Sequence, residues 1–509
     1  PPLRSHFANV SRHLEQLLNV RSRIRQGRSS RAKASKVQDA SSRVDLNDPS
    51  GGIEVGDPLG HTSVGEPVAA TSEADFTNPY DFDTIASGLT FKGRTEEMNE
   101  ILDSIESGTH TAIFGLQRMG KTSLIEEGLE ERLKLNPQLA SKLLLAKVDF
   151  QRLGGQQVKY GDLFRAIIGA IAEAMLTGGL GRSTPNLRML TNDLFRQNDQ
   201  GDRTQFFGKF ASLIRGLAEV SRRQIVLFID EFSEIRKAIE QNRRAMVDKP
   251  LRNRHLLPHD MYLDIPFVHH LSSMLRDRNL KRKLTLIVAV RPFMAEYDDK
   301  EDLQILKLMR PITLYYLDET AARALIVEPL AGKVGHEPGA IDDLYRLTAG
   351  HPYLLQFMLK SLVDRIRREE RRTITREDVA WIQRRMITEG PAYDAQFAVV
   401  ISDYSVDEIT IPQESLLGKG TLALIAKIGI EQREGWVFES QIYEALARHQ
   451  VPREKSASLL SQFVRVKILE ERALDGNLCY RISIPLLLQR FVEQNLHLKY
   501  FRSTRLMQT

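Results

Sequence analysis

One short segment constrains this chain more than any other: residues 115–123 read Gly-Leu-Gln-Arg-Met-Gly-Lys-Thr-Ser. The spacing matches the pattern G-x-x-x-x-G-K-[ST], and the apolar residues 111–114 precede it. Glycine lets the backbone curl so that its N–H groups face phosphate oxygens, and a helix that begins here adds its positive dipole end. The sequence therefore predicts a phosphate-binding loop, with these binding residues: Gly115, Gln117, Arg118, Met119, Gly120, Lys121, Thr122 and Ser123.

The residue types of this loop indicate its chemistry. Lys121 would reach the β- and γ-phosphates of a nucleotide, and the Thr122 hydroxyl would coordinate Mg²⁺. The apolar run 224–229 ends in Asp230 and Glu231, so Asp230 would complete the metal site. Glu231 is placed to polarise the attacking water as a general base. We therefore expect ATP or ADP with Mg²⁺ as cofactors, and Lys121 and Glu231 as catalytic residues.

A second buried-strand pattern, residues 284–290, ends at Arg291. Ligands of open α/β sheets bind at the carboxyl ends of the strands. Arg291 is therefore a candidate for reading the γ-phosphate and distinguishing ATP from ADP. The alternative is an ordinary exposed arginine in a loop.

Apolar strands alternate with amphipathic helices between residues 76 and 317. We expect strands at 110–114, 143–150, 224–229, 284–290 and 312–317, and helices that include 162–175 and 205–220. Strands that are apolar throughout predict a parallel sheet covered on both faces. The predicted fold class is α/β: a parallel-sheet P-loop NTPase of the ASCE, AAA-like type, followed by a helical lid and a winged helix.

The rest of the chain divides by pattern. Residues 318–386 read as all helical, 390–416 are less regular, and the end reads helix, strand, helix, helix, hairpin and helix, which suggests a winged helix. The hairpin signal is Asp475-Gly476-Asn477. Trp381 and Trp436 are expected in the cores of the lid and winged helix. The predicted domains are 1–75, 76–317, 318–395 and 396–509.

The first 75 residues differ in composition from the rest. An amphipathic helix is expected at 7–17, and 26–75 are rich in Ser, Gly, Asp and Ala, which predicts a linker. A basic run at 21–36 precedes an acidic stretch at 45–75, and a further basic loop spans 242–255. We interpret both basic segments as solvated, with nucleic-acid or membrane contact as the alternative.

The net charge, the cysteine count and the lack of long apolar runs limit which classes of protein this chain can belong to. The net charge is only +5, and the single cysteine, Cys479, excludes an intrachain disulfide. No apolar run of 18 or more residues predicts a membrane span, and no apolar segment near the start predicts a secretory signal. We therefore expect a cytoplasmic protein.

Three further segments resemble those of a known group. Residues 78–80 read Asn-Pro-Tyr, 91–94 read Phe-Lys-Gly-Arg, and 350–356 read Gly-His-Pro-Tyr-Leu-Leu-Gln. With the loop and the Asp-Glu pair, they resemble the STAND-type signal-transduction ATPases over residues 76–495. The resemblance is strongest to the branch of single-chain prokaryotic ATPases with an MNS-type P-loop domain.

This resemblance implies further site residues. The segment with Phe91, Gly93 and Arg94 would line the adenine pocket, and Pro352 would pack on the base. Arg291 is similar to the sensor arginine of NACHT and NB-ARC relatives. Relatives often carry a winged-helix histidine that contacts the nucleotide, whereas His449 falls at a helix end here and is expected on the surface.

Three function classes remain. The first is a nucleotide switch that opens on ATP exchange and then oligomerises or acts on an effector protein, and this class is favoured. The second is an AAA+-type DNA-handling ATPase, for which the third helix and its C-terminal end offer basic residues at 453, 455, 465 and 467. That class is less favoured because His-Pro follows the lid glycine, where AAA+ lids usually carry arginine. The third is a nucleotide-locked scaffold with little hydrolysis.

Overall fold

The computed structural model describes residues 77–150, 160–178, 203–235, 265–291, 301–402 and 412–506. The chain divides into two compact units, Pro1–Ala74 and Asp75–Thr509, and the described residues belong to the second. The helix predicted at 7–17, the linker at 26–75 and the basic loop at 242–255 lie outside the described residues. Within the described part, no helix has the length and apolar character needed to span a membrane.

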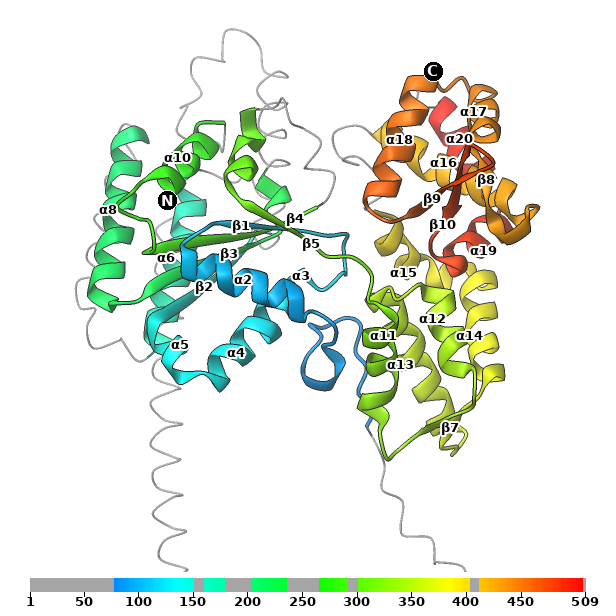
Figure 1. Ribbon diagram of the computed structural model, residues 1–509, viewed down its shortest axis with the longest axis horizontal. Helices are drawn as coiled ribbons and strands as arrows, with labels where there is room; N and C mark the ends of the chain where they lie inside the picture. The colour runs from blue at the N-terminus through cyan, green and yellow to red at the C-terminus, as the bar shows by residue number, and fades with distance from the viewer. Residues whose placement is uncertain are drawn as a thin grey trace, which may run out of the picture. The chain divides into compact units, whose positions relative to one another are not determined.

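A parallel sheet of five strands, in the order β2-β3-β4-β1-β5, forms the first part of the described unit (Figure 1). Four of the predicted strands are confirmed within one residue at each end. All seven residues of β4 are buried, as expected for a sheet with helices on both faces. The strands are β1 (Thr111–Phe114), β2 (Leu143–Asp149), β3 (Gln224–Asp230), β4 (Leu284–Val290) and β5 (Arg310–Thr313).

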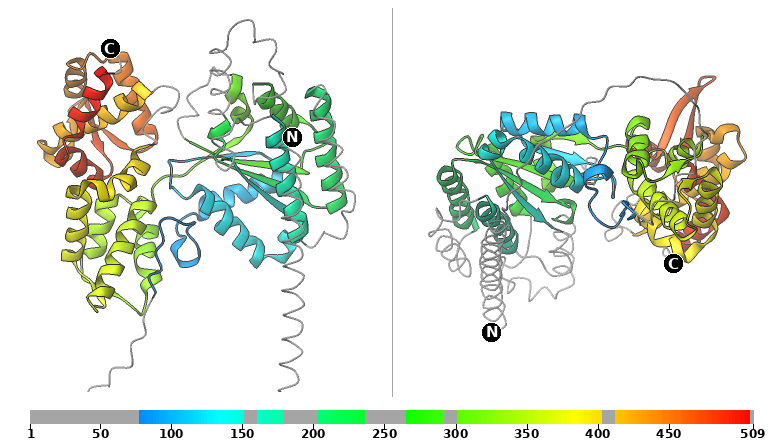
Figure 2. Two further views of the ribbon diagram at one scale, coloured as in Figure 1. Left: turned by 180° about the vertical axis from the view of Figure 1, so that it is seen from behind. Right: turned by 90° about the horizontal axis from the view of Figure 1, so that it is seen from below.

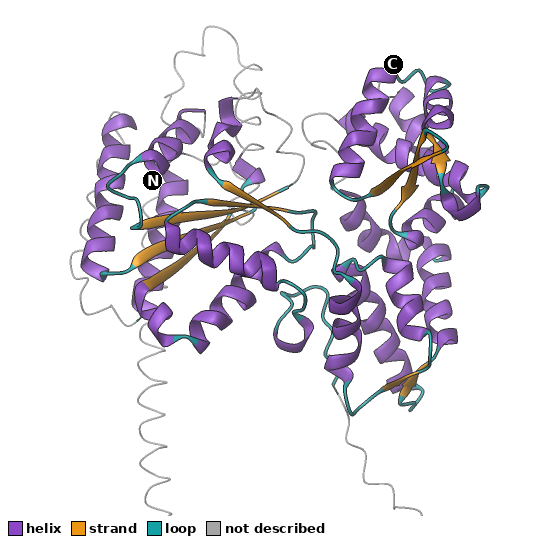
Figure 3. Cartoon of the chain, viewed as in Figure 1, coloured by secondary structure: helices purple, strands orange, loops and turns teal. Residues whose placement is uncertain are grey.

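The two faces of the sheet bury alternate residues of each strand. Val226 and Phe228 of β3 belong to a core cluster with residues of α2, whereas Ile225 and Leu227 belong to a second cluster with α6, α8 and α10. The predicted helices at 162–175 and 205–220 lie within α6 and α8. Figure 3 shows these helices beside the sheet, and they are α2 (Thr95–Ser107), α4 (Glu130–Leu135), α5 (Pro137–Lys142), α6 (Tyr160–Thr177), α8 (Arg203–Ser221), α10 (Ile265–Arg276), with the 3-10 segments η1 (Gly88–Thr90) and η7 (Glu301–Leu308).

The fifth strand was predicted wrongly at 312–317. β5 begins at Arg310 and includes Pro311, which is tolerated because β5 is an edge strand and proline lacks the N–H that a central strand needs. Residues 314–317 are apolar for another reason: they lead into the lid, and Leu314 and Leu317 are buried. Residues 314–317, which we call the hinge segment, belong to no helix or strand.

The lid follows the hinge segment. Its helices are held by a long apolar stripe on α13, where Leu355, Leu359, Leu362 and Ile366 are fully buried. Two short strands, β6 and β7, pair in parallel, so the all-helical prediction was wrong at these positions. The lid elements are α11 (Glu319–Val327), η8 (Glu328–Leu330), β6 (Gly335–His336), α12 (Ala340–Thr348), α13 (Pro352–Arg368), β7 (Thr373–Ile374) and α14 (Arg376–Thr388).

The C-terminal part carries a small sheet of three strands in the order β8-β10-β9 (Figure 2). Asp475 and Gly476 form the turn between β9 and β10, both with positive φ, as a two-residue type I′ hairpin requires. The stretch predicted as less regular, 390–416, includes α15 and the start of α16. The elements are α15 (Gly390–Ser402), α16 (Pro412–Ile430), η9 (Arg433–Gly435), β8 (Val437–Phe438), α17 (Glu439–Ala447), α18 (Arg453–Arg465), β9 (Leu469–Leu474), β10 (Asn477–Ile482), α19 (Pro485–Glu493) and α20 (Leu496–Leu506).

A buried arginine joins the lid to the C-terminal part. Arg490 of α19 is 1% exposed, donates to the Met386 carbonyl and to Asp394, and lies 4.3 Å from the Phe397 ring centroid. A buried guanidinium has lost its hydration, so it is stable only where hydrogen bonds and a carboxylate replace the water. α19 is therefore fixed to α14 and α15.

Three single-residue expectations have mixed outcomes. Trp436 is buried, as predicted. Trp381 is only partly buried, because two arginines rather than core residues cover its ring. His449 was wrongly expected on the surface: it lies beyond the end of α17, is half-buried, and its ring stacks on Phe501 with centroids 3.9 Å apart.

Candidate nucleotide-binding site

The loop after β1 curls as the motif predicts. Arg118 and Gly120 both have positive φ, 62° and 87°, and the helical turn α3 (Lys121–Ser123) begins directly afterwards. Lys121 is buried, and its Nζ donates to the carbonyls of Gly115 at 2.8 Å and Leu116 at 2.9 Å. An ammonium has three N–H donors, so one more can serve a phosphate oxygen. The lysine is thus held at the loop before any ligand contact.

The helix after the loop departs from the regular helix that was expected. Leu124–Leu129 (η2) is π-helical and continues into α4. A Cβ on Gly128 in this segment would lie 2.4 Å from Met98 and 3.3 Å from the Phe91 ring. Phe91 therefore packs against the helix that carries the loop. Segments of π-helix are frequent at functional sites.

Thr122 and Asp230 meet at the carboxyl edge of the sheet. Thr122 Oγ1 donates to Asp230 Oδ2 at 2.5 Å, and the other Asp230 oxygen accepts the backbone N–H of Glu231 at 2.9 Å. Burial raises the pKa of Asp230, although the Thr122 hydrogen bond opposes this shift. The predicted metal ligands are therefore adjacent, and a cation there would relieve the cost of burying the carboxylate.

Glu231 and Arg291 lie together at the ends of β3 and β4. Glu231 has a φ of 50°, a conformation that costs energy in a non-glycine residue and is frequent at functional sites. Arg291 Nε is 3.6 Å from Glu231 Oε2, and its Nη2 is 3.7 Å from Glu234 Oε1. Its backbone N–H donates to Ser233 Oγ at 3.1 Å. The arginine is thus held beside the candidate general base.

The predicted adenine-lining segment is tied to the loop through Arg94. This buried guanidinium donates to the carbonyls of Met119 at 3.2 Å and Tyr315 at 2.7 Å, and pairs with Glu97 at 3.0 Å. Gly93 is required beside it, because its φ is 68° and a Cβ would lie 2.2 Å from the Ala321 Cβ. Arg94 therefore connects the loop to the hinge segment.

The lid approaches the same region through the start of α13. Gly350 has a φ of 74°, and a Cβ there would lie 2.1 Å from the Leu317 carbonyl oxygen. Leu317 N–H donates to the Gly350 carbonyl at 2.9 Å. Pro352 occupies the first turn of α13, and the Arg118 guanidinium lies 5.6 Å from the Tyr353 ring centroid.

The structure thus brings most of the predicted residues to one sheet edge, since β3, β4 and β1 are neighbours. Met119 differs: its side chain is buried in the core, so only its backbone can serve a ligand. Asp149 was missed. It ends β2 in register with Asp230, whereas the predicted strand ran on to residue 150, so the sequence pattern did not place Asp149 at the sheet edge.

Comparison with known families gives one match. The sequence model of the family Novel STAND NTPase 1 matches residues 81–382, more than half of this 509-residue chain. The matched span begins directly after the Asn78-Pro79-Tyr80 segment and ends within α14. No curated protein sequence matches the chain significantly.

Solved structures with a similar fold include a Walker-type ATPase. The Walker-type ATPase PABY2304 of Pyrococcus abyssi superposes with a TM-score of 0.50 at 14% identity, over 80% of this chain and 97% of that one. The ORC2 protein of Aeropyrum pernix, solved as ADPNP–ADP complexes, gives a TM-score of 0.48 at 12% identity, over 85% and 97%. At these identities the likeness concerns the fold alone.

Proposed function

Because the chain belongs to the Novel STAND NTPase 1 family, we propose that it is an ATP-dependent switch whose nucleotide sets the arrangement of the lid. The observation that carries this proposal is the 2.5 Å hydrogen bond between Thr122 and Asp230, beside the buried Lys121. Hydroxyl and carboxylate oxygens are ligands that suit Mg²⁺. When bound, the ion would neutralise charge on the β- and γ-phosphates.

Hydrolysis would be slow and controlled by Arg291. Glu231 is the general base that orients the attacking water, and its carboxylate now lies 3.6 Å from the Arg291 guanidinium. A γ-phosphate, with more negative charge than a carboxylate, would draw Arg291 away and leave Glu231 able to accept a proton. One arginine would thus sense the phosphate and release the base.

Three contacts between residues would transmit the state of the nucleotide to the lid. Arg94 joins the loop to Tyr315 of the hinge segment, Leu317 bonds to Gly350, and Arg118 lies over Tyr353. Because Arg490 fixes α19 to the lid, we propose that the C-terminal part, a winged helix, moves with the lid. Such a change requires a nucleotide that binds the two arrangements with different affinity.

The first test is the nucleotide that the purified protein carries. Wild-type protein is denatured and the released nucleotide identified, with Lys121→Ala as the binding-site variant and Lys134→Ala, an exposed lysine of α4, as the control. We expect ADP from wild type and from the control, and none from Lys121→Ala. Equal nucleotide content in all three proteins would mean that the bound nucleotide does not depend on Lys121, and would contradict binding at the P-loop.

The partner of the open form is proposed to be a second copy of the chain or an effector protein. Light scattering of the protein with ADP and with ATP measures this directly. We expect a rise in mass with ATP, which Glu231→Gln should prolong. A constant mass in both nucleotides would leave an effector protein as the partner, and pull-down with each nucleotide then separates the two.

DNA binding is a second candidate because α18 begins with an exposed arginine. Arg453 lies at the start of this helix, with its guanidinium 5.0 Å from the Tyr443 ring centroid. Against it, the exposed Lys467 places its Nζ 5.9 Å from the Tyr315 ring centroid of the hinge segment. DNA affinity measured against salt decides, since phosphate contacts give a steep slope. No binding at low salt would remove this candidate.

A further inference from the structure

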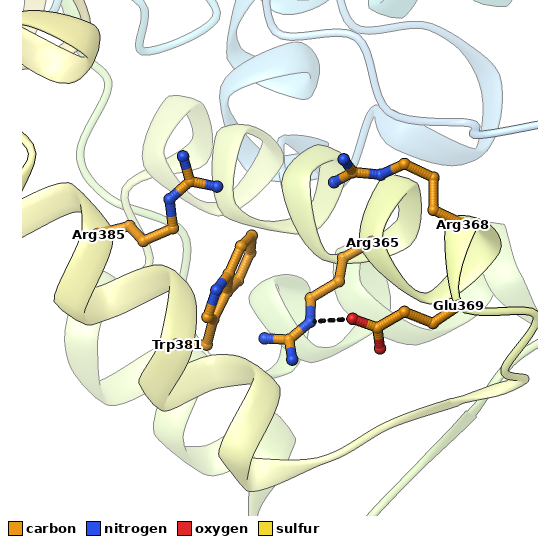
Figure 4. A pocket seen from close by; sticks show the side chains of 5 residues that line it. All are labelled: Arg365, Arg368, Glu369, Trp381 and Arg385. Carbon is orange, nitrogen blue, oxygen red and sulfur yellow. Dashed lines mark hydrogen bonds and ion pairs between the residues drawn. The ribbon is translucent and has the colours of Figure 1, made fainter.

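A pocket of about 290 Å³ lies on the lid, away from the P-loop, between α13 and α14 (Figure 4). We call it the arginine pocket, and its lining residues are Arg365, Arg368, Glu369, Trp381 and Arg385. Arg385 pairs with Glu389 at 2.7 Å, and Arg365 lies 3.5 Å from Asp378. With Arg371, which pairs with Glu369 and Asp378, four positive and three negative groups gather at the pocket. The excess positive charge attracts an anion.

Trp381 fixes two of the guanidinium groups in place. Figure 4 shows the indole between them, with the Arg365 guanidinium 4.4 Å and that of Arg385 4.9 Å from the ring centroid. Arginine stacked on an aromatic ring loses little further freedom when its N–H fork binds a ligand. Arg365 and Arg385 are thus held in place as one wall of the pocket, and Arg385 also donates to Glu389.

One guanidinium remains for a ligand, that of the exposed Arg368. Arg365 Nε donates to Glu369 at 2.9 Å, and its Nη1, which has no hydrogen-bond partner among the described residues, is shielded from solvent. Arg368 donates Nε–H to the Asp364 carbonyl at 3.2 Å and pairs with no carboxylate in the described part of the chain. An anion that enters the pocket would therefore accept from the Arg368 N–H groups.

We propose that the arginine pocket binds a phosphomonoester dianion, either free phosphate or a phosphate group on a small molecule. A monocarboxylate would gain little, because Glu369 already supplies one carboxylate to Arg365. A dianion with three oxygens accepts more than one hydrogen bond from Arg368, while Glu369 stays paired with Arg365. A base cannot stack on Trp381, since guanidinium groups cover both faces, so recognition is of the phosphate. The site is separate from the P-loop and does not depend on the proposed ATP switch.

The sequence contains two tryptophans, which permits a direct assay. The full-length chain with Lys121→Ala, which disables the P-loop, and Trp436→Phe, which leaves Trp381 as the fluorophore, is titrated with inorganic phosphate, phenyl phosphate, acetate and a short oligonucleotide. We expect saturable changes in Trp381 emission with the two phosphomonoesters and none with acetate. Phosphate alone would indicate a free-ion site, and phenyl phosphate alone a phosphorylated small molecule; both support the proposal.

The variant Arg368→Ala should weaken binding about tenfold or more, as loss of a charge-assisted hydrogen bond does. Arg448→Ala, an arginine of similar chemistry whose side chain is 73% exposed, is the control and should change nothing. Arg368 also lies at the C-terminal end of α13, where a cation stabilises the helix. A lower melting temperature in Arg368→Ala with unchanged phosphate titration would overturn the proposal in favour of that structural role. A response to the oligonucleotide alone would also overturn it.

Discussion

The P-loop and the arginine pocket both gather positive charge, but by different means. At the P-loop the charge comes from backbone N–H groups, a helix start and Lys121, whose exposure is 6%. At the arginine pocket it comes from side chains on two helices, with Arg365 and Arg385 21% and 38% exposed. A backbone-built site is rigid and water-poor, so each interaction there is strong, whereas exposed guanidinium groups are screened by solvent. Substitutions should therefore have large effects at the first site and smaller ones at the second.

The largest effect is expected for ATP affinity. Lys121→Ala leaves the phosphate charge uncompensated in a buried site and should weaken ATP binding roughly 1,000-fold. Arg368→Ala should leave ATP affinity unchanged, because the arginine pocket is a separate site. Calorimetric titration of both variants with Mg-ATP measures this. A similar loss in both would mean that the two sites are one functional unit.

Hydrolysis should fall next most strongly. Glu231→Gln keeps the shape but removes the base, so we expect ATP binding within about twofold and turnover reduced about 100-fold. Glu234→Gln, the neighbouring carboxylate that also lies near Arg291, is the control. Single-turnover hydrolysis of ATP checks the assignment. If Glu234→Gln is the slower enzyme, the base is Glu234.

Substitutions at the contact between the hinge segment and the lid should change stability rather than ATP binding or hydrolysis. An alanine at Gly350 adopts a φ of 74° and also meets the Leu317 carbonyl, whereas Gly332 has a φ of 73° with open space around it. We expect Gly332→Ala to cost about 1 kcal/mol, and Gly350→Ala at least ~3 kcal/mol. Urea unfolding of both proteins measures the difference. An equal loss of unfolding free energy in the two variants would mean that Leu317 moves away from the added methyl group without strain.

The smallest effect concerns the carboxylate behind the arginine pocket. Burial alone would raise the pKa of Asp378, but hydrogen bonds from Arg371 and Thr375 lower it to about 2. A lowered pKa adds stability above the unfolded value of 3.8, which is lost as the pH falls toward 2. We expect wild type to lose about 2 kcal/mol over that window.

Asp378→Asn should be less stable than wild type near neutral pH and should not show that loss. Its exposed neighbour on α14, Glu377, offers the control Glu377→Gln, which should follow the wild-type profile. Unfolding free energies between pH 2 and 6 give both curves. If Asp378→Asn and wild type lose stability in parallel, the acid sensitivity arises elsewhere.

The sequence predicted the features that depend on the backbone geometry of a few consecutive residues. The P-loop, the strand ending in Asp230 and the turn at Gly476 each depend on a few consecutive residues, so their patterns could be read directly. The position of β5 could not, because Leu314 and Leu317 are buried in a core cluster that includes the lid, although they belong to no strand. An apolar run reports burial but not what covers it.

Contacts between side chains of different helices and strands could not be predicted from the sequence either. Trp381 was predicted in the core because tryptophan is usually buried, yet arginines from α13 and α14 cover it. The pairing of Arg291 with Glu231 was also not visible, because it depends on the neighbouring positions of β3 and β4 in the sheet. Such contacts follow from tertiary packing, which single-sequence patterns do not contain.

The central claim is that the nucleotide sets the arrangement of the lid, and hydrogen exchange at the hinge segment tests it most directly. The amide of Leu317, which donates to the Gly350 carbonyl, is measured in peptides covering 314–317 with saturating Mg-ADP and Mg-ATP, in the Glu231→Gln background to prevent turnover. If the nucleotide sets the arrangement of the lid, the Leu317 amide should exchange slowly with Mg-ADP bound and faster with Mg-ATP bound. Identical exchange in the two nucleotides, with both shown to be bound, would contradict it.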